Sequence, residues 1–154
     1  MLCCPRGRLE KGEKSMKKEA WNDGWLVRHL NTNDAWQKVT LPYDCMIHEQ
    51  RSDDAEGGCN NGWFMGYDYE LVKHFRCSSV QLKRRVRNYL ELEAVYRQGE
   101  VYCNDQLVVK RDNGYLNLTG ELTPYLREGE NTVRVIAHNA QMPSARWYTG
   151  AGIY

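Results

Sequence analysis

The chain has 154 residues, of which 42% are hydrophobic and 27% are charged, and its 21 basic and 20 acidic residues leave a net charge of +1. This length fits one domain with a core of its own. The balanced charge gives no overall field toward nucleic acid or an anionic membrane, and the composition excludes a disordered or fibrous chain. Ten tyrosines and five tryptophans favour strands and sugar-binding surfaces.

The first 18 residues, MLCCPRGRLEKGEKSMKK, are polar and unpatterned and include a second methionine, Met16. We expect a disordered leader or an upstream start that is not used. No apolar run has the length of a signal peptide or a membrane span. The six cysteines show no Cys-x-x-Cys spacing and no paired histidines. We therefore expect free thiols in a reducing cytoplasm, with no metal site and no cofactor.

Alternating apolar and polar residues predict strands at residues 67–75, 89–95 and 132–137. The residues expected on the buried face of the first are Tyr67, Tyr69, Leu71 and Phe75. No helical period persists for three turns. Short antiparallel strands with frequent turns indicate an all-β fold, an antiparallel β-sandwich of jelly-roll type.

Turn signals separate these strands. Asn104 and Asp105 lie between two β-rich runs and predict a tight hairpin, whose turn type is left open. Further turns are expected at residues 112–115 and 127–131, with a short helical turn at residues 121–126.

The long irregular stretch at residues 42–62, PYDCMIHEQRSDDAEGGCNNG, is the first place to look for a ligand, because ordered loops of this length are usually functional. Its GGCNNG run precedes a strand, so it does not form a phosphate-binding loop. Within it, His48, Glu49, Asp53 and Asp54 lack the spacing of a calcium or zinc site, and a solvated loop is the better interpretation.

Other motifs for catalysis or nucleic-acid binding are weak. Ser144, His138 and Asp112 have the residue types of a catalytic triad, but Ser144 lacks the Gly-x-Ser-x-Gly elbow, so the sequence gives little support for one. No feature of the sequence selects the two carboxylates that a glycosidase needs. A basic cluster without interleaved aromatic residues indicates a solvated loop or strand edge; it consists of Lys83, Arg84, Arg85 and Arg87.

Five motifs appear in an order that resembles one family. They are WQKVTLPYDCMI (36–47), GWFMGYDYELVKHF (62–75), LELEAVYRQGEVYCNDQLV (90–108), NGYLNLTGELTPYLREGENTVRVIAHN (113–139) and SARWYTGAGIY (144–154). Together they resemble the N-terminal sugar-binding domain of glycoside hydrolase family 2, the β-galactosidases, β-glucuronidases and β-mannosidases. The resemblance implies a galactose-binding-domain-like jelly roll over residues 19–154 that lacks its last strand or strands. We therefore expect the isolated chain to be marginally folded.

The resemblance also implies a role. The catalytic glutamates of the family lie in a TIM barrel. We expect this chain to lack that barrel and the immunoglobulin-like domain, so no residue of this chain is expected to be catalytic. The first domain closes one side of the active site and contacts the non-reducing sugar. The expected contacts are Asn60, Asn61 and Arg146, because an amide both donates and accepts and a guanidinium offers a planar fork. For each a structural role stays open: Asn60 and Asn61 as a turn before Gly62, and Arg146 as an ion-pair partner.

The expected partner is a carbohydrate with a terminal β-linked sugar, a galactoside, and neither nucleic acid nor a membrane. The parent enzyme is expected to be a hydrolase, and whether it forms a homo-oligomer is left open. Two alternatives stay open: a free-standing carbohydrate-binding module, and a structural or oligomer-forming unit. Departures from the family pattern at Tyr43, Cys45, Ala94 and Asp105 leave the sugar undefined.

Overall fold

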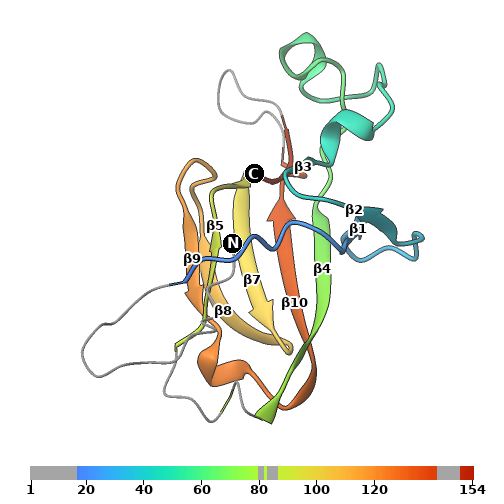
Figure 1. Ribbon diagram of the computed structural model, residues 1–154. Helices are drawn as coiled ribbons and strands as arrows, with labels where there is room; N and C mark the ends of the chain where they lie inside the picture. The colour runs from blue at the N-terminus through green and yellow to red at the C-terminus, as the bar shows by residue number, and fades with distance from the viewer. Residues whose placement is uncertain (1–16, 80–81, 83–86, 142–149) are drawn as a thin grey trace.

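The computed structural model describes residues 17–79, 82, 87–141 and 150–154 (Figure 1). Antiparallel strands carry the fold, as the sequence predicted, with short 3-10 helices in the connections: η1 (Met46–His48), η2 (Gly58–Asn61) and η3 (Thr123–Tyr125). The last of these is the helical turn expected at residues 121–126. Within the described part of the chain, no helix is sufficiently long and apolar to span a membrane.

The larger layer is a six-stranded antiparallel sheet. Its strand order is β2 (Gln37–Val39), β1 (Trp25–His29), β4 (Tyr69–Cys77), β10 (Gly129–His138), β7 (Gln98–Cys103) and β8 (Gln106–Arg111). The strands predicted at residues 67–75 and 132–137 form its central pair, β4 and β10. Because these two strands run in opposite directions, the start of β4 lies beside the end of β10, where Tyr69 pairs with Ala137.

Two small sheets form the opposing layer. One joins β5 (Tyr89–Leu92) to β9 (Leu118–Glu121), and the other has the order β3 (Tyr43–Asp44), β11 (Gly152–Ile153) and β6 (Val95–Tyr96). The prediction of one continuous strand over residues 89–95 is therefore wrong. The chain leaves β5 after Leu92 and enters a different sheet at Val95, while the backbone of Ala94 exchanges two hydrogen bonds with Tyr154.

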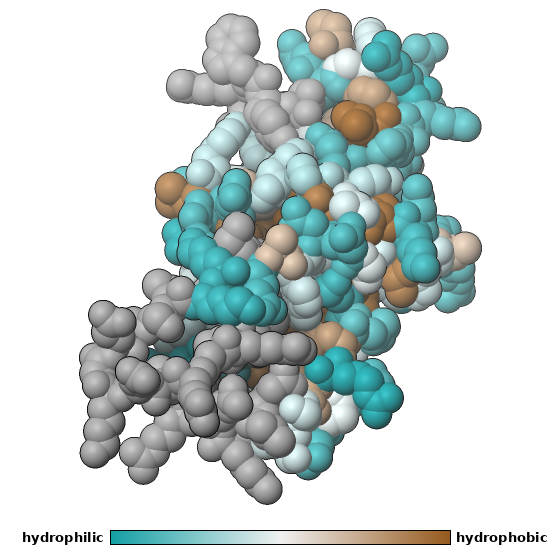
Figure 2. Space-filling model, in the orientation of Figure 1, coloured by the Kyte–Doolittle hydropathy of each residue, from teal (hydrophilic) through white to brown (hydrophobic). Residues whose placement is uncertain are grey.

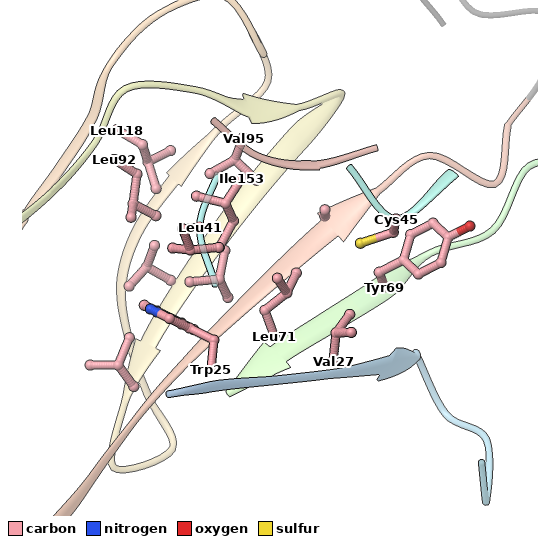
Figure 3. Close-up of a cluster of buried hydrophobic side chains, with 14 of the residues drawn as sticks. Trp25, Val27, Leu41, Cys45, Tyr69, Leu71, Leu92, Val95, Leu118 and Ile153 are labelled. Atoms are coloured by element: carbon pink, nitrogen blue, oxygen red, sulfur yellow. The ribbon is translucent and has the colours of Figure 1, made fainter. Parts of the chain in front are cut away.

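The core fills the space between the layers (Figure 3). Alternate residues of β10 supply it, and Val133, Val135 and Ala137 are fully buried, as the period-two pattern predicted. Trp25 is also buried, and its indole N–H donates to the carbonyl of Trp21 over 2.9 Å. Both small sheets contribute apolar side chains to the same cluster, among them Leu90, Leu92, Val95, Leu118 and Ile153.

One prediction for the buried face of β4 is wrong. Tyr69, Leu71 and Phe75 belong to the core or pack against it, but Tyr67 is exposed. The strand begins at Tyr69, so Tyr67 lies outside the alternating pattern and contacts the end of the sandwich instead. Its ring centroid lies 4.6 Å from that of His29.

The hairpin at Asn104 and Asp105 has the type I′ geometry, since both residues have positive φ angles of 49° and 64°. The side chain of Asn104 fixes the neighbouring connection. Its amide nitrogen donates to the carbonyl of Tyr125 and to Oδ1 of Asn131, each over 2.8 Å, and its Oδ1 accepts from the Thr132 N–H. The two φ angles therefore decide the turn type that the sequence left open.

The final described residues lie inside the sandwich. Strand β11 pairs with β3 on one side and β6 on the other, and Ala151 and Ile153 are buried. Asp44 ties this strand to the start of the long loop. Its Oδ1 accepts from the N–H groups of Met46 (3.0 Å) and Ala151 (3.1 Å), and its Oδ2 accepts from the hydroxyl of Tyr154 (2.6 Å).

Candidate functional site

Three connections converge at one end of the sandwich, where β1 and β10 end and β4 begins (Figure 1). They are residues 30–36, the long stretch between β3 and β4, and residues 139–141. A hollow of about 300 Å³ lies between them, lined by His29, Leu30, Asn31, Thr32, Gly66, Tyr67, Asp68 and Ala140. A second hollow of about 190 Å³ also contains His29, and a third of about 270 Å³ also contains Asp68. This end is therefore the candidate site.

Residues 50–66, called the lobe below, extend beyond the sheets at this end (Figure 1). The lobe has internal hydrogen bonds of its own: the Ser52 N–H donates to the carbonyl of Trp63, and the Trp63 N–H donates to that of Gly58, each over 2.9 Å. The guanidinium of Arg51 lies 5.3 Å above the centre of the Phe64 ring. These contacts make the predicted irregular stretch an ordered structure.

The lobe presents part of its surface to solvent. The space-filling view shows a small apolar area at this end within a mostly hydrophilic surface (Figure 2). Ile47, just before the lobe, and Trp63 are among the exposed large apolar residues of the described chain. An exposed indole beside polar groups suits a sugar, which presents C–H faces as well as hydroxyls.

The two predicted asparagines have different surroundings. Asn60 is exposed on η2, so its amide is open to a ligand. Asn61 is only 3% exposed, and its amide nitrogen donates to the carbonyl of Phe64 over 2.6 Å. Gly62 follows with a φ of 70°, the left-handed conformation that ends the helix. Asn61 therefore supports the fold of the lobe, and Arg146 lies outside the described residues.

His29 joins the lobe to the sandwich and was missed by sequence reasoning. Its Nε2 lies 2.9 Å from Oε1 of Glu49, and its Nδ1 lies 2.8 Å from Oδ2 of Asp34. The hydroxyl of Tyr69 also donates to Glu49 over 3.2 Å. Burial acts to lower the pKa of His29, but the hydrogen bonds to Asp34 and Glu49 outweigh it and raise the pKa above 6.5.

Asp68 binds the backbone of the third connection, residues 139–141. Its Oδ1 accepts from the N–H groups of Asn139 (2.7 Å) and Ala140 (2.8 Å), while its Oδ2 lies 2.8 Å from Nδ1 of His138. Burial acts to raise the pKa of Asp68, yet these hydrogen bonds bring it below its ordinary value. The sequence carried a signal for this pair, because an antiparallel register of the two central strands places Asp68 beside His138.

The remaining chemical motifs do not assemble among the described residues. In the triad considered from the sequence, His138 contacts the carboxylates of Asp68 and Glu100 instead of Asp112. Ser144, its third member, lies outside the described residues. The ring of His48 stacks on Tyr43 with centroids 4.9 Å apart. Within the described ranges, no group of three or more His, Cys, Asp or Glu side chains could hold a metal ion. Of the basic cluster, Arg87 pairs with Glu121.

Comparison with known proteins decides the family. Residues 67–153 match the family described as "Glycosyl hydrolases family 2, sugar binding domain", which is more than half of the 154 residues. The chain belongs to glycosyl hydrolase family 2. The match begins at the exposed Tyr67 and ends in β11, so it includes Asp68, His138 and both central strands.

Two curated family 2 relatives illustrate the range of named activities. The chain is 32% identical over 120 residues to "Beta-galactosidase BoGH2A" of Bacteroides ovatus, covering 77% of this chain and 14% of that protein. It is 26% identical over 117 residues to "Beta-glucuronidase" of Formosa agariphila, covering 73% of this chain and 12% of that protein. The chain thus spans about an eighth of the length of these relatives and matches their sugar-binding part.

Solved family 2 structures share the fold. A β-glycosidase from Bacteroides vulgatus has 27% identity and a TM-score of 0.75, with 86% of this chain and 18% of that chain covered. A family 2 member from Bacteroides cellulosilyticus has a TM-score of 0.76 at 24% identity, with 88% and 19% covered. The sandwich of this chain is therefore that of the sugar-binding domain in much longer proteins.

Proposed function

We propose that this chain is the non-catalytic sugar-binding domain of a larger β-glycosidase and that its lobe contacts the terminal sugar of the substrate. The match of residues 67–153 to the family 2 sugar binding domain is the observation that carries the assignment of the domain. The lobe directly precedes that match, and its contact with the sugar is argued from its own exposed side chains. The exposed amide of Asn60 and the exposed indole of Trp63, three residues further along the lobe, supply a donor, an acceptor and an apolar face. Bond cleavage is assigned to residues of the larger protein.

We propose a β-galactoside as the sugar. The described hollows are lined by four carboxylates, those of Asp34, Glu49, Asp68 and Glu100, and by the cations Arg28, Arg97 and Lys110. The hollow of about 300 Å³ that Gly66 of the lobe lines contains the Asp68 carboxylate and none of these three cations. A glucuronide carries a carboxylate of its own, whose approach to groups of the same charge is unfavourable. A galactoside is neutral, and its hydroxyls can donate to these same oxygens. The relatives carry both names, one β-galactosidase and two β-glucuronidases, so the choice rests on the charge of this hollow.

Binding of methyl β-galactoside to the chain, measured by titration calorimetry, tests the site. We expect weak binding with a Kd on the order of 1 mM, as for a small and exposed contact surface. Asn60→Ala should weaken binding about fivefold, the effect of one lost hydrogen bond of roughly 1 kcal/mol. Asn22→Ala, at an exposed residue just before β1, is the matched control and should bind like wild type. Equal binding by Asn60→Ala and Asn22→Ala would contradict the proposal.

Hydrolysis assays test the assignment of bond cleavage to the larger protein. The purified chain should not hydrolyse an aryl β-galactoside, whereas a longer protein that carries it should do so, and faster than it hydrolyses an aryl β-glucuronide. Activity proportional to the concentration of the chain alone would overturn the non-catalytic assignment. Sugar binding without activity in any longer protein would favour the free-standing carbohydrate-binding module.

A further inference from the structure

The two residues that flank the lobe contact the same side chain. Glu49 directly precedes the lobe and Tyr67 directly follows it, and both contact His29 at the end of β1. The Glu49 carboxylate lies 2.9 Å from Nε2 of His29, and the Tyr67 ring packs with its centroid 4.6 Å from the imidazole. One imidazole therefore contacts the chain on both sides of the lobe, at the points where the lobe leaves the sandwich and returns to it.

Both nitrogens of that imidazole face carboxylates. Nδ1 of His29 lies 2.8 Å from Asp34, which also accepts from the hydroxyl of Thr32 over 2.7 Å. Only the imidazolium form has N–H groups on both nitrogens, so only this form can donate to Asp34 and Glu49 together. The neutral ring keeps one N–H and turns a lone pair toward the other carboxylate. Deprotonation must therefore weaken one of the two contacts.

We infer that His29 is a positioning residue for the lobe, which its imidazolium form fixes and its neutral form releases. The groups that face it are Asp34 and Thr32 from the connection after β1, Glu49 from the long loop, and Tyr67 and Tyr69 at the start of β4. Further titratable or charged groups of the adjoining hollows are Arg28, Tyr43, Cys45, His48 and Asp68. Two carboxylates and no cation contact the ring directly among the described residues.

The direction of the pH effect follows from the geometry and agrees with the raised pKa of His29. A histidine with a pKa above its unfolded value stabilises the folded arrangement fully below that unfolded value and loses this contribution as pH rises through the folded pKa. The lobe is therefore held most firmly in mild acid and becomes more mobile at alkaline pH. For the sugar contact proposed above, on which this functional consequence rests, affinity should fall in the same direction.

Hydrogen exchange of lobe amides, corrected for intrinsic exchange rates, tests the inference on the full chain. In wild type we expect protection of residues 50–66 to fall about tenfold from about pH 5.5 to about pH 8.5, the effect of one charge-assisted hydrogen bond. His29→Gln, which has a single donor group, should show the lower protection at both values. His48→Gln, which removes the imidazole stacked on Tyr43, should keep the wild-type pH dependence.

The outcomes separate this inference from the proposed function. Protection that does not change with pH in wild type, or that changes equally in His29→Gln, would overturn the role of His29. The wild-type pH series decides the matter even where His29→Gln fails to fold. Methyl β-galactoside is titrated at the same two pH values. Absence of binding at both would refute the proposed sugar contact while leaving the exchange result as the test of lobe positioning.

Discussion

Replacement of Asp44 by alanine should strongly destabilise the protein. This carboxylate accepts hydrogen bonds from the N–H groups of Met46 and Ala151 and from the hydroxyl of Tyr154, at 3.0, 3.1 and 2.6 Å. Ala151 is fully buried, so its N–H has no access to bulk water after the substitution. A buried polar group without a partner costs about 1–3 kcal/mol. Water can partly replace the lost hydrogen bonds of the Met46 N–H and the Tyr154 hydroxyl. We therefore expect the free energy of unfolding to fall by about 3 kcal/mol.

Urea unfolding followed by tryptophan fluorescence measures this loss, because Trp25 lies in the core. Tyr154→Phe removes the 2.6 Å hydrogen bond to Asp44 and should cost about 1 kcal/mol. Asp54→Ala, at an exposed carboxylate of the lobe, should stay within about 0.5 kcal/mol of wild type. A loss of stability in Asp44→Ala no larger than that in Asp54→Ala, or a larger loss in Tyr154→Phe than in Asp44→Ala, would refute the role of this carboxylate.

Three further substitutions test separate parts of the structure. Asp105→Gly should stabilise the protein by about 1 kcal/mol, because the φ of 64° at this turn position costs nothing for glycine; unchanged urea midpoints would contradict this. Gly99→Ala should cost about 1–3 kcal/mol in the same assay, since a methyl group there would lie 2.8 Å from Cβ of Val95, and a neutral result would show that the layers separate easily. Asp68 has a lowered pKa, so its stabilising effect is present above about pH 4 and is lost as pH falls through the folded pKa. The melting temperature of Asp68→Asn should therefore lie below that of wild type near neutral pH and approach it in acid, and a constant difference would refute the role of the carboxylate.

Alternation was sufficient to predict the central strands. Val133, Val135 and Ala137 are buried on one face of β10 because successive side chains of a strand point to opposite faces of the sheet. On β4 the opposite face is covered as well, since Glu70 and Val72 are also buried. The same pattern failed at Tyr67 and between Leu92 and Val95. Alternation records which residues face a core, and it contains no information on where the backbone leaves one sheet for another.

The candidate site was only partly predictable. The length of the irregular stretch indicated the lobe, and the exposed position of Asn60 agrees with a ligand contact there, which stays a prediction. Asn61 looked equivalent in the sequence, but burial and its hydrogen bond to Phe64 assign it to the fold of the lobe. His29 could not have been found, because its contacts to Asp34 and Glu49 join segments whose proximity depends on the packed sandwich.

Titration of the isotope-labelled chain with methyl β-galactoside, followed by amide chemical shifts, tests the central claim most directly. We predict that the largest shift changes occur in the lobe around Asn60 and Trp63 and at residues of the hollow that Gly66 of the lobe also lines, with the far end of the sandwich, at the hairpin of Asn104 and Asp105, unaffected. Saturable changes centred away from the lobe, or none up to the solubility limit of the sugar, would contradict it.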